Sequence, residues 1–522
     1  MGFGGGGGST TVGYRYYMTL QIALGRGPFD AVKEIKVGDK TAWPWRDGET
    51  GAYDSAITGD TVRQIDAPNL FNGDKGEGGI QGSLTVMMGS ASQIYPDWIK
   101  NLIGTDVPDF RGVVTAVFDG LICSLNPYPK TWKFRNQRAL AGWDGDPWHP
   151  ELAVISLLSD AAGSVAGTPT DPWIRAMNPV HILYECVTNR SWGRGYSRSR
   201  IGEASWLAAA QTLYNEGFGL CIPWNRQQEL GEFVKEVIKH IGGSMYTSRE
   251  TGLLELKLFR NDYDVNSIPL FTYDTGLLEL SDPETPSLAD AIGEVVVSYH
   301  EPVTDEDKET RAQNLAVIQA TEGINSQKVS YRGIPTQSLA SRVAQRDLKA
   351  QSAEVSRYTV KLDRRAWKIY PGAVFRVAAP DKGVTNLVLR AGKISDSVLT
   401  DGAITVEAAL DVFGMPATAF TSVPDSGYQK PSKTPVVISK RVLREVTYQE
   451  LASVMSEADR QFITADDAMI ATVAARPSNL MLNYNVYSKT STEDYADRGA
   501  ATYAAYAEVS TLVGYYDATI DF

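Results

Sequence analysis

The chain has 522 residues and a net charge of −12, from 50 Lys and Arg against 62 Asp and Glu. This length exceeds one ordinary hydrophobic core and predicts roughly three or four domains, while the acidic balance disfavours general nucleic-acid binding. Three widely spaced cysteines exclude a disulfide framework and a zinc spacing. The apolar runs are all too short to span a membrane as a helix.

The chain begins with a glycine-rich segment followed by a predicted strand. Met1–Gly8 is almost entirely glycine, which has little surface to pack and much conformational freedom to lose. Behind it, apolar and polar residues alternate up to Leu24, and this pattern predicts a strand with one buried face. We interpret residues 1–11 as a flexible arm suited to assembly. The candidate inter-subunit residues are Gly4, Gly5, Gly6, Gly7, Gly8, Tyr14, Tyr16 and Tyr17.

Residues 12–130 are predicted to form a β domain. The dipeptides Gly38-Asp39 and Asp119-Gly120 are each typical of a hairpin turn. Residues 69–82 are dense in glycine and are interpreted as a loop that opens into a strand. Residues 131–177 are interpreted as an irregular connection, in which Leu152–Leu158 is the one short apolar element.

Residues 178–290 are predicted to be an inserted α+β domain. Asn178 is a good N-cap and Pro179 suits the first helical position, while further helices are expected over about 202–216 and 227–241. The glycine pair at 242 and 243 is a natural helix end.

Residues 291–430 are predicted to be a second β domain. It contains a charged loop over 301–312, a helix starting near Thr336 and a hairpin at Asp401-Gly402. Residues 431–522 are expected to be an incomplete mixed β domain with a short helix over Ala500–Val509. The predicted fold class is mainly β with α+β insertions, in several domains.

The sequence contains few groups arranged for catalysis or metal binding. The segment Asp144–Glu151 has two Asp, one His and one Glu, but the spacing fits neither an EF-hand nor a zinc enzyme. The glycine runs precede strands rather than helices, so they do not predict a phosphate loop. His149, His181, His240 and His300 are interpreted as packing or surface residues. We therefore predict no catalytic residues, no metal and no cofactor.

Two clusters combine basic and aromatic residues, a pattern that can follow a nucleic-acid strand. The alternatives are a half-exposed strand, a loop paired with acidic neighbours, and a subunit interface matched in charge. The basic members of the first cluster are Lys130, Lys133, Arg135 and Arg138. Those of the second cluster are Arg190, Arg194, Arg198 and Arg200.

Four groups of segments carry a resemblance to a known family. They are Gly13–Tyr17 with Leu24–Pro28, Asn69–Gly79, Asn178–Cys186 followed by Trp192–Gly195, and Ile334–Gly372. In order and spacing over most of residues 12–490, they resemble the central hub proteins of siphophage tail tips. This group is similar to the N-terminal hub region of the phage lambda tip attachment protein J and to the baseplate hub of T-even phages.

The resemblance implies β-barrel hub domains with smaller inserted domains, in a homotrimer whose six barrels form a pseudo-sixfold ring. Such a ring would join the hexameric tail tube to threefold tip structures and close or gate the lumen for DNA ejection. The implied location is the virion tail tip, after assembly in the bacterial host cytoplasm. The implied partners are the distal tail protein and tail tube hexamer, other tail-tip proteins, tail fibres, the tape measure protein, DNA transiently during ejection, and the host envelope indirectly.

Two other function classes stay open at this point. The chain could be a tail enzyme that degrades the host cell wall, although no residue pair points to that chemistry. It could also be a carbohydrate-binding or receptor-binding module, in which Trp143 and Trp148 would stack on sugars.

Overall fold

The computed structural model describes residues 15–44, 56–73, 76–123, 128–162, 171–284, 291–352, 356–396, 402–412, 421–422, 437–464, 469–477, 481–489 and 494–504. The predicted arm with Gly4–Gly8, Tyr14 and the residue Asp401 lie outside these ranges. The chain divides into two compact units, Met1–Val423 and Pro424–Phe522, and each is described by itself.

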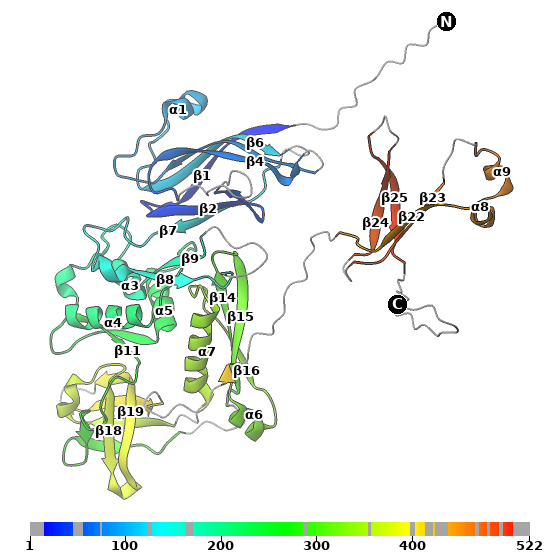
Figure 1. Ribbon diagram of the computed structural model, residues 1–522. Coiled ribbons are helices and arrows are strands. Elements are labelled where there is room, and N and C mark those ends of the chain that lie inside the picture. The colour runs from blue at the N-terminus through cyan, green and yellow to red at the C-terminus, as the bar shows by residue number, and fades with distance from the viewer. Residues whose placement is uncertain are drawn as a thin grey trace, which may run out of the picture. The chain divides into compact units, whose positions relative to one another are not determined.

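The first unit starts with two antiparallel sheets (Figure 1). Their strands are β1 (Tyr16–Arg26), β2 (Ala31–Val37), β3 (Lys40–Trp43), β4 (Thr61–Gly73), β5 (Gly78–Met87), β6 (Val113–Cys123) and β7 (Trp132–Gln137). One sheet has the order β1-β6-β5-β4 and the other β3-β2-β7. Val32 and Ile35 of β2 share one core with Leu84 of β5 and Phe118 of β6, so the two sheets pack face to face. The helix α1 (Asp97–Ile103) follows β5.

The alternation seen at the start of the chain does produce a strand with one buried face. In β1, the side chains of Tyr16, Met18, Leu20 and Leu24 are half-buried against this core, whereas Tyr17 is exposed. The predicted hairpin at Gly38-Asp39 is confirmed, because it joins β2 to β3. The glycine-dense segment 69–82 is the end of the β4–β5 pair rather than an open loop.

The predicted hairpin at Asp119-Gly120 is wrong. Both residues lie inside β6, which pairs with β1 on one side and with β5 on the other. Gly120 is opposite Gly82, and a Cβ on Gly82 would lie 2.3 Å from the backbone oxygen of Asp119. Two strands approach closely here, and glycine is needed for that approach rather than for a turn.

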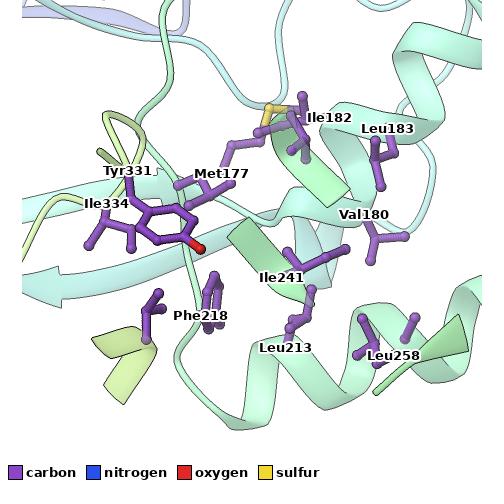
Figure 2. Packing of buried hydrophobic residues seen from close by; sticks show 14 of the residues in the cluster. Met177, Val180, Ile182, Leu183, Leu213, Phe218, Ile241, Leu258, Tyr331 and Ile334 are labelled. Atoms are coloured by element: carbon purple, nitrogen blue, oxygen red, sulfur yellow. The ribbon is translucent and has the colours of Figure 1, made fainter. Parts of the chain in front are cut away.

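A helical region follows the sheets in the chain. It consists of α2 (Pro150–Ala153), β8 (Val154–Leu158), β9 (Trp173–Met177), α3 (Pro179–Thr188), the 3₁₀ turn η1 (Arg198–Arg200), α4 (Glu203–Asn215), α5 (Leu230–Ile241), β10 (Gly243–Thr247) and β11 (Leu254–Leu258). Figure 2 shows part of its core, with Val180 and Leu183 from α3, Leu213 from α4 and Ile241 from α5.

The predicted helices in this region are confirmed, although the one expected from about residue 227 begins at Leu230, and two of their ends have clear causes. The side chain of Asn178 accepts a hydrogen bond from the backbone N–H of Val180, which satisfies an otherwise free donor at the start of α3. Gly242 ends α5 in the left-handed conformation, with φ of 63°. The element predicted at Leu152–Leu158 is the end of α2 followed by β8, which pairs with β9.

The core of the helical region continues into a second mixed layer. Its elements are β14 (Glu294–Glu301), β15 (Glu306–Gln313), α6 (Leu315–Thr321), β16 (Ser326–Ser330), α7 (Gln337–Ser352) and β21 (Thr421–Ser422). The predicted charged loop over 301–312 is wrong, since most of it is β15, which pairs with β14 along its length. The helix expected near Thr336 is α7, which buries Leu339, Val343 and Leu348 against this layer.

A six-stranded sheet completes the first unit. Its members are β12 (Leu270–Phe271), β13 (Leu277–Leu280), β17 (Arg357–Leu362), β18 (Val374–Ala379), β19 (Val384–Asp396) and β20 (Ile404–Leu410), with the 3₁₀ turns η3 (Arg364–Lys368) and η4 (Pro380–Lys382). The strand order is β12-β18-β19-β20-β17-β13, and the two outer strands do not pair with each other. Within the described residues the sheets are therefore open and differ from the barrels that the resemblance implied.

The second unit contains two short hairpins and two short helices. Its elements are β22 (Arg441–Glu445), α8 (Tyr448–Val454), α9 (Glu457–Arg460), β23 (Ile470–Ala474), β24 (Asn483–Ser488) and β25 (Ala496–Thr502). Strands β22 and β23 form one hairpin, and β24 and β25 the other. Residues 500–502 belong to β25, so the helix predicted from Ala500 is wrong there, while 505–509 lie outside the described residues.

The protein is thus a multidomain fold, mainly β with α+β parts, as predicted. Across the ranges that the structure describes, no helix is long and apolar enough to cross a membrane.

We predict that the close approach of β5 and β6 makes Gly82 intolerant of any side chain. The Gly82→Ala variant should lose about 1–3 kcal/mol of unfolding free energy, because its Cβ would meet backbone atoms that cannot turn aside. Gly59→Ala is the control, since a Cβ there has no neighbour within 4 Å. Thermal unfolding of the full chain measures both, and equal transitions for the two variants would contradict the prediction.

The buried His240 should make the fold sensitive to acid. Its Nδ1 donates to the backbone oxygen of Glu236 at 2.7 Å, and its Nε2 accepts from the N–H of Gly333 at 3.2 Å, so only the neutral ring satisfies both contacts. Burial lowers the pKa of His240 from 6.5 to about 4. Stability that depends on the neutral ring is therefore fully present above about pH 6.5 and is lost as the pH falls toward 4.

Because the ring takes up a proton more readily in the unfolded chain, the free energy of unfolding should be about 2 kcal/mol lower at pH 5 than at pH 7.5. The His240→Gln variant, which removes the titrating group, should be less stable than the native sequence at pH 7.5 but should lose less on acidification. Urea unfolding followed by tryptophan fluorescence at both pH values tests this. An unchanged pH dependence in the variant would show that other groups control the acid sensitivity.

Candidate assembly interface

The outer edge of β1 is a candidate pairing surface. Among the described strands, β1 pairs only with β6, so one side of its backbone has no strand beside it. An edge of 11 residues is long, and β1 contains neither the Pro nor the Lys that commonly block edge-to-edge pairing. The strand therefore has the properties of an edge that accepts another strand.

The two described tyrosines of the predicted interface lie on opposite faces of β1. Tyr16 packs against the sandwich core, whereas Tyr17 is 69% exposed. Tyr17 is thus the one of the two that is available to a partner. Thr19 hydrogen-bonds to Asp119 at 2.7 Å, which ties the outward face of β1 to its neighbour β6.

The first basic cluster meets carboxylates of the same chain. The Nζ of Lys130 pairs with Glu77, and the Nζ of Lys133 lies 2.7 Å from Asp305. The Nε of Arg135 lies 3.3 Å from Glu34. Both terminal nitrogens of Arg138 donate to the carboxylate of Glu185 at 2.8 Å. Each of the four cations therefore has an anionic partner inside the first unit.

The alternation of β7 explains why this cluster looked like a nucleic-acid motif. Trp132 and Phe134 face the sandwich core. Lys133 and Arg135 alternate with them along the strand and therefore point the other way. On that side Arg135 also donates to the backbone oxygen of Asp171, and Lys36 of β2 donates to the backbone oxygen of Val303 at 2.9 Å. The cations join the β3-β2-β7 sheet to the helical region and the mixed layer.

The Arg138–Glu185 pair contains the most buried carboxylate of these four contacts. Only 3% of the Glu185 side chain is exposed, and burial raises the pKa of this carboxyl while the Arg138 guanidinium lowers it. The loop after Arg138 is held as well, because the Asp30 carboxylate accepts hydrogen bonds from the backbone N–H groups of Ala139, Leu140 and Ala141. We call the contacts that Asp30, Lys36, Arg135 and Arg138 make in this way the junction.

The second basic cluster is arranged differently. Arg190 forms two side-chain hydrogen bonds with Asp144, at 2.6 and 2.8 Å, and these hold the pKa of Asp144 well below its usual range. Arg198 donates to the backbone oxygen of Asp146. Arg194 and Arg200 are both exposed. This cluster lies at the surface, and the structure does not bring it together with the first cluster.

The segment Asp144–Glu151, considered above for metal binding, instead contributes to packing and surface contacts. His149 lies between Glu151 and Glu203, at 2.9 and 3.1 Å. Trp148 stacks on Tyr184 with ring centroids 4.6 Å apart and is almost fully buried. Within the described part of the chain, no group of three His, Cys, Asp or Glu side chains is placed to hold a metal ion.

A groove of about 800 Å³ lies beside the junction. Its wall includes Trp192 and Trp224, and Trp224 stacks on Phe233 with centroids 5.2 Å apart. The opposite wall comes from β1 and β7 and includes Arg26. Sequence reasoning did not identify this groove, because its lining comes from segments that are far apart in the chain.

The buried thiols are poor candidates for chemistry. Burial raises the pKa of Cys186 and of Cys221 to about 12. A thiol with such a pKa remains protonated at neutral pH and is a weak nucleophile.

Residues 232–392 match a family model described as "Putative phage tail protein". The match covers less than half of the chain, from α5 through the helix α7 and into β19. No curated protein matches the chain.

Three solved structures are similar to this chain at low identity. A chain in the virion of a native gene transfer agent particle is 16% identical, with a TM-score of 0.43, over 77% of this chain and 80% of that chain. A tail protein from Neisseria meningitidis is 10% identical, with a TM-score of 0.29, over 74% and 98%. A prophage tail protein from Shewanella oneidensis is 11% identical, with a TM-score of 0.26, over 37% and 56%. These TM-scores are too low to establish a common overall fold.

We predict that the junction depends on the Arg138–Glu185 pair. In the Arg138→Ala variant, Glu185 would be left buried without its cation, which should cost about 3–5 kcal/mol of unfolding free energy. Arg190→Ala is the matched control, because its pair with Asp144 has the same bidentate form on the surface, where 79% of the Arg190 side chain is exposed. Denaturant unfolding of the two variants compares them, and similar losses in both would contradict the prediction.

Proposed function

We propose that this protein is a structural component of a phage tail and that it forms the trimeric hub of the tail tip. The observation that carries the proposal is the match of residues 232–392 to the family of putative phage tail proteins. In this proposal three copies form a ring that joins the hexameric tail tube to threefold tip structures and closes or gates the lumen.

The unpaired edge of β1 supports a role in assembly. A long strand edge without blocking residues is unfavourable in a protein that acts as a monomer, because it invites association. In a closed ring the same edge can pair with a neighbouring copy and cease to be exposed. We propose that the arm with Gly4–Gly8 and Tyr14, the exposed side chain of Tyr17 and the backbone of Tyr16 take part in this contact.

The junction supports a mechanical role for the first unit. A hub has to transmit force between the tube and the tip, which requires that its domains do not slide past one another. Buried ion pairs and backbone contacts of the kind seen at Arg138, Lys36 and Asp30 meet this requirement. In the proposal, the predicted domains over 12–130 and 178–290, and the part of the 291–430 domain that belongs to the first unit, act as one body.

The carbohydrate-binding alternative receives less support from the geometry. Trp148 is buried by its stacking on Tyr184, so it presents no free face to a sugar, and Trp143 is half-buried against the same core. Exposed aromatic faces are needed for such stacking, and neither of these two residues is exposed.

The proposal predicts three copies of this chain in each tail. Quantitative mass spectrometry of purified tails, with the tail tube protein as the internal standard, measures the copy number. Images of the tail tip should show threefold symmetry at the same level. Any copy number other than three would overturn the trimeric hub.

The edge of β1 can be tested without disturbing the fold. Lysines at the exposed positions Gln21 and Ala23 should prevent a second strand from pairing there, as edge lysines do in other sheets. Tail assembly should fall at least tenfold, while the unfolding transition of the purified chain stays unchanged. Lysines at the exposed Gln211 and Asn215 of α4 are the control. Normal tails from the β1 variant would refute the proposed pairing.

A further inference from the structure

The described residues of the second unit form almost no hydrophobic core. Of the residues that the structure describes in Pro424–Phe522, only Ala474 is buried. By contrast, the same 57 described residues contain 11 of the 30 exposed large apolar side chains that the structure describes in both units. The most exposed of them are Val437, Tyr448, Val454, Phe462 and Leu482.

Such a unit cannot be stable in water by itself. Two-stranded hairpins are marginal without a further layer, and ordering each residue costs about 1–2 kcal/mol of conformational entropy. The burial of apolar surface normally offsets that cost, and in the described residues of this unit very little apolar surface is buried. The hairpins therefore need an apolar partner to remain folded.

Both faces of the β22–β23 hairpin need to be covered. Val442 is opposite Val473 in the register, so these two side chains share one face. Leu443 and Ile470 lie on the other face, because Leu443 is one residue from Val442 and Ile470 is three residues from Val473, both odd numbers. All four side chains are between 47% and 64% exposed. A single flat contact could cover only one of these faces.

We propose that the second unit is an obligate interface between copies of this chain, in which each hairpin packs between the equivalent units of its two neighbours. In a cyclic assembly of three or more copies, every subunit contacts one neighbour with each of two different surfaces. That arrangement covers both faces of β22–β23. An obligate interface of this kind resembles a domain core that has been divided between chains.

The charge of this segment agrees with self-association. Residues 437–504 carry seven Lys and Arg against nine Asp and Glu, a net charge of −2 within a chain of −12. Like-charged copies repel one another, so a nearly neutral segment with both signs is the part best suited to meet itself. The inference rests on the proposed homotrimer and identifies the surface that would hold it together.

The test uses the full chain and two variants, one for each face of the hairpin. Leu443→Asp and Val473→Asp replace side chains that are 64% and 47% exposed in the isolated chain, so neither should unfold the first unit. Leu102→Asp in α1 is the control, since Leu102 is 58% exposed and lies outside the second unit. Native mass spectrometry over a concentration series measures the number of copies.

We expect the native chain and the control to form a closed oligomer of at least three copies. Each hairpin variant should dissociate at a concentration at least tenfold higher. Amide hydrogen exchange should show β22 and β23 protected in the native oligomer and unprotected in both variants, while β5 and β6 stay protected throughout.

Three results would overturn the inference. They are a native monomer in which β22 and β23 are already protected, an oligomer that neither variant weakens, and an oligomer that only one variant weakens. If tails contain three copies and the hairpin variants assemble as well as the native chain, this interface is rejected and the hub proposal stands. If the chain is absent from tails but the purified chain forms an oligomer that both variants disrupt, the hub is rejected and the interface is supported.

Discussion

A buried ion pair, Arg138 with Glu185, is central among the contacts that hold the N-terminal sheets to the rest of the first unit. A carboxylate that is almost fully removed from water is tolerated only with a cation and good hydrogen-bond geometry, and both nitrogens of Arg138 supply them at 2.8 Å. The pair connects the end of the β3-β2-β7 sheet to the helix α3. Because α3 is also the centre of the largest core, this contact links the orientation of the N-terminal sheets to the rest of the unit.

That constraint has a consequence for the edge of β1. An exposed strand edge is useful for assembly only if its position is reproducible, because strand pairing needs both register and direction. The β1-β6-β5-β4 sheet shares a core with the β3-β2-β7 sheet, and the junction fixes the latter against the helical region. The edge is therefore presented from a rigid support rather than from a hinge, which reduces the entropy that is lost on pairing.

Local signals in the sequence predicted much of this structure. The alternation in β1, the Asn178 cap of α3, the Gly242 end of α5 and the helix near Thr336 were each set by neighbouring residues, and each was predicted. The failures have a different origin. Asp119-Gly120 has the composition of a turn, but its glycine is required by β5, a strand that is distant in sequence. The charged residues of β15 form a strand because β14 pairs with them.

The basic clusters show the same limit for function. The alternation of cations and aromatics on β7 was visible in the sequence, but the carboxylates that face those cations come from Glu34, Glu77, Glu185 and Asp305. No local pattern indicates which of 62 acidic residues will lie beside a given arginine. A cluster of cations and aromatic residues in a sequence can therefore belong to a nucleic-acid site or to an internal contact. Only the positions of the carboxylates around the cations distinguish the two.

The two units use opposite solutions to the same physical problem. The first unit covers its sheets with its own chain, through facing sheets, helices and paired charges. The described residues of the second unit leave many of their apolar side chains exposed, and in our proposal the free energy that stabilises this unit comes from neighbouring copies. A protein built in this way can fold most of its mass before assembly and complete the rest only when copies meet. In the proposal, the second unit therefore completes its folding only as the copies assemble, and it is not stably folded before that.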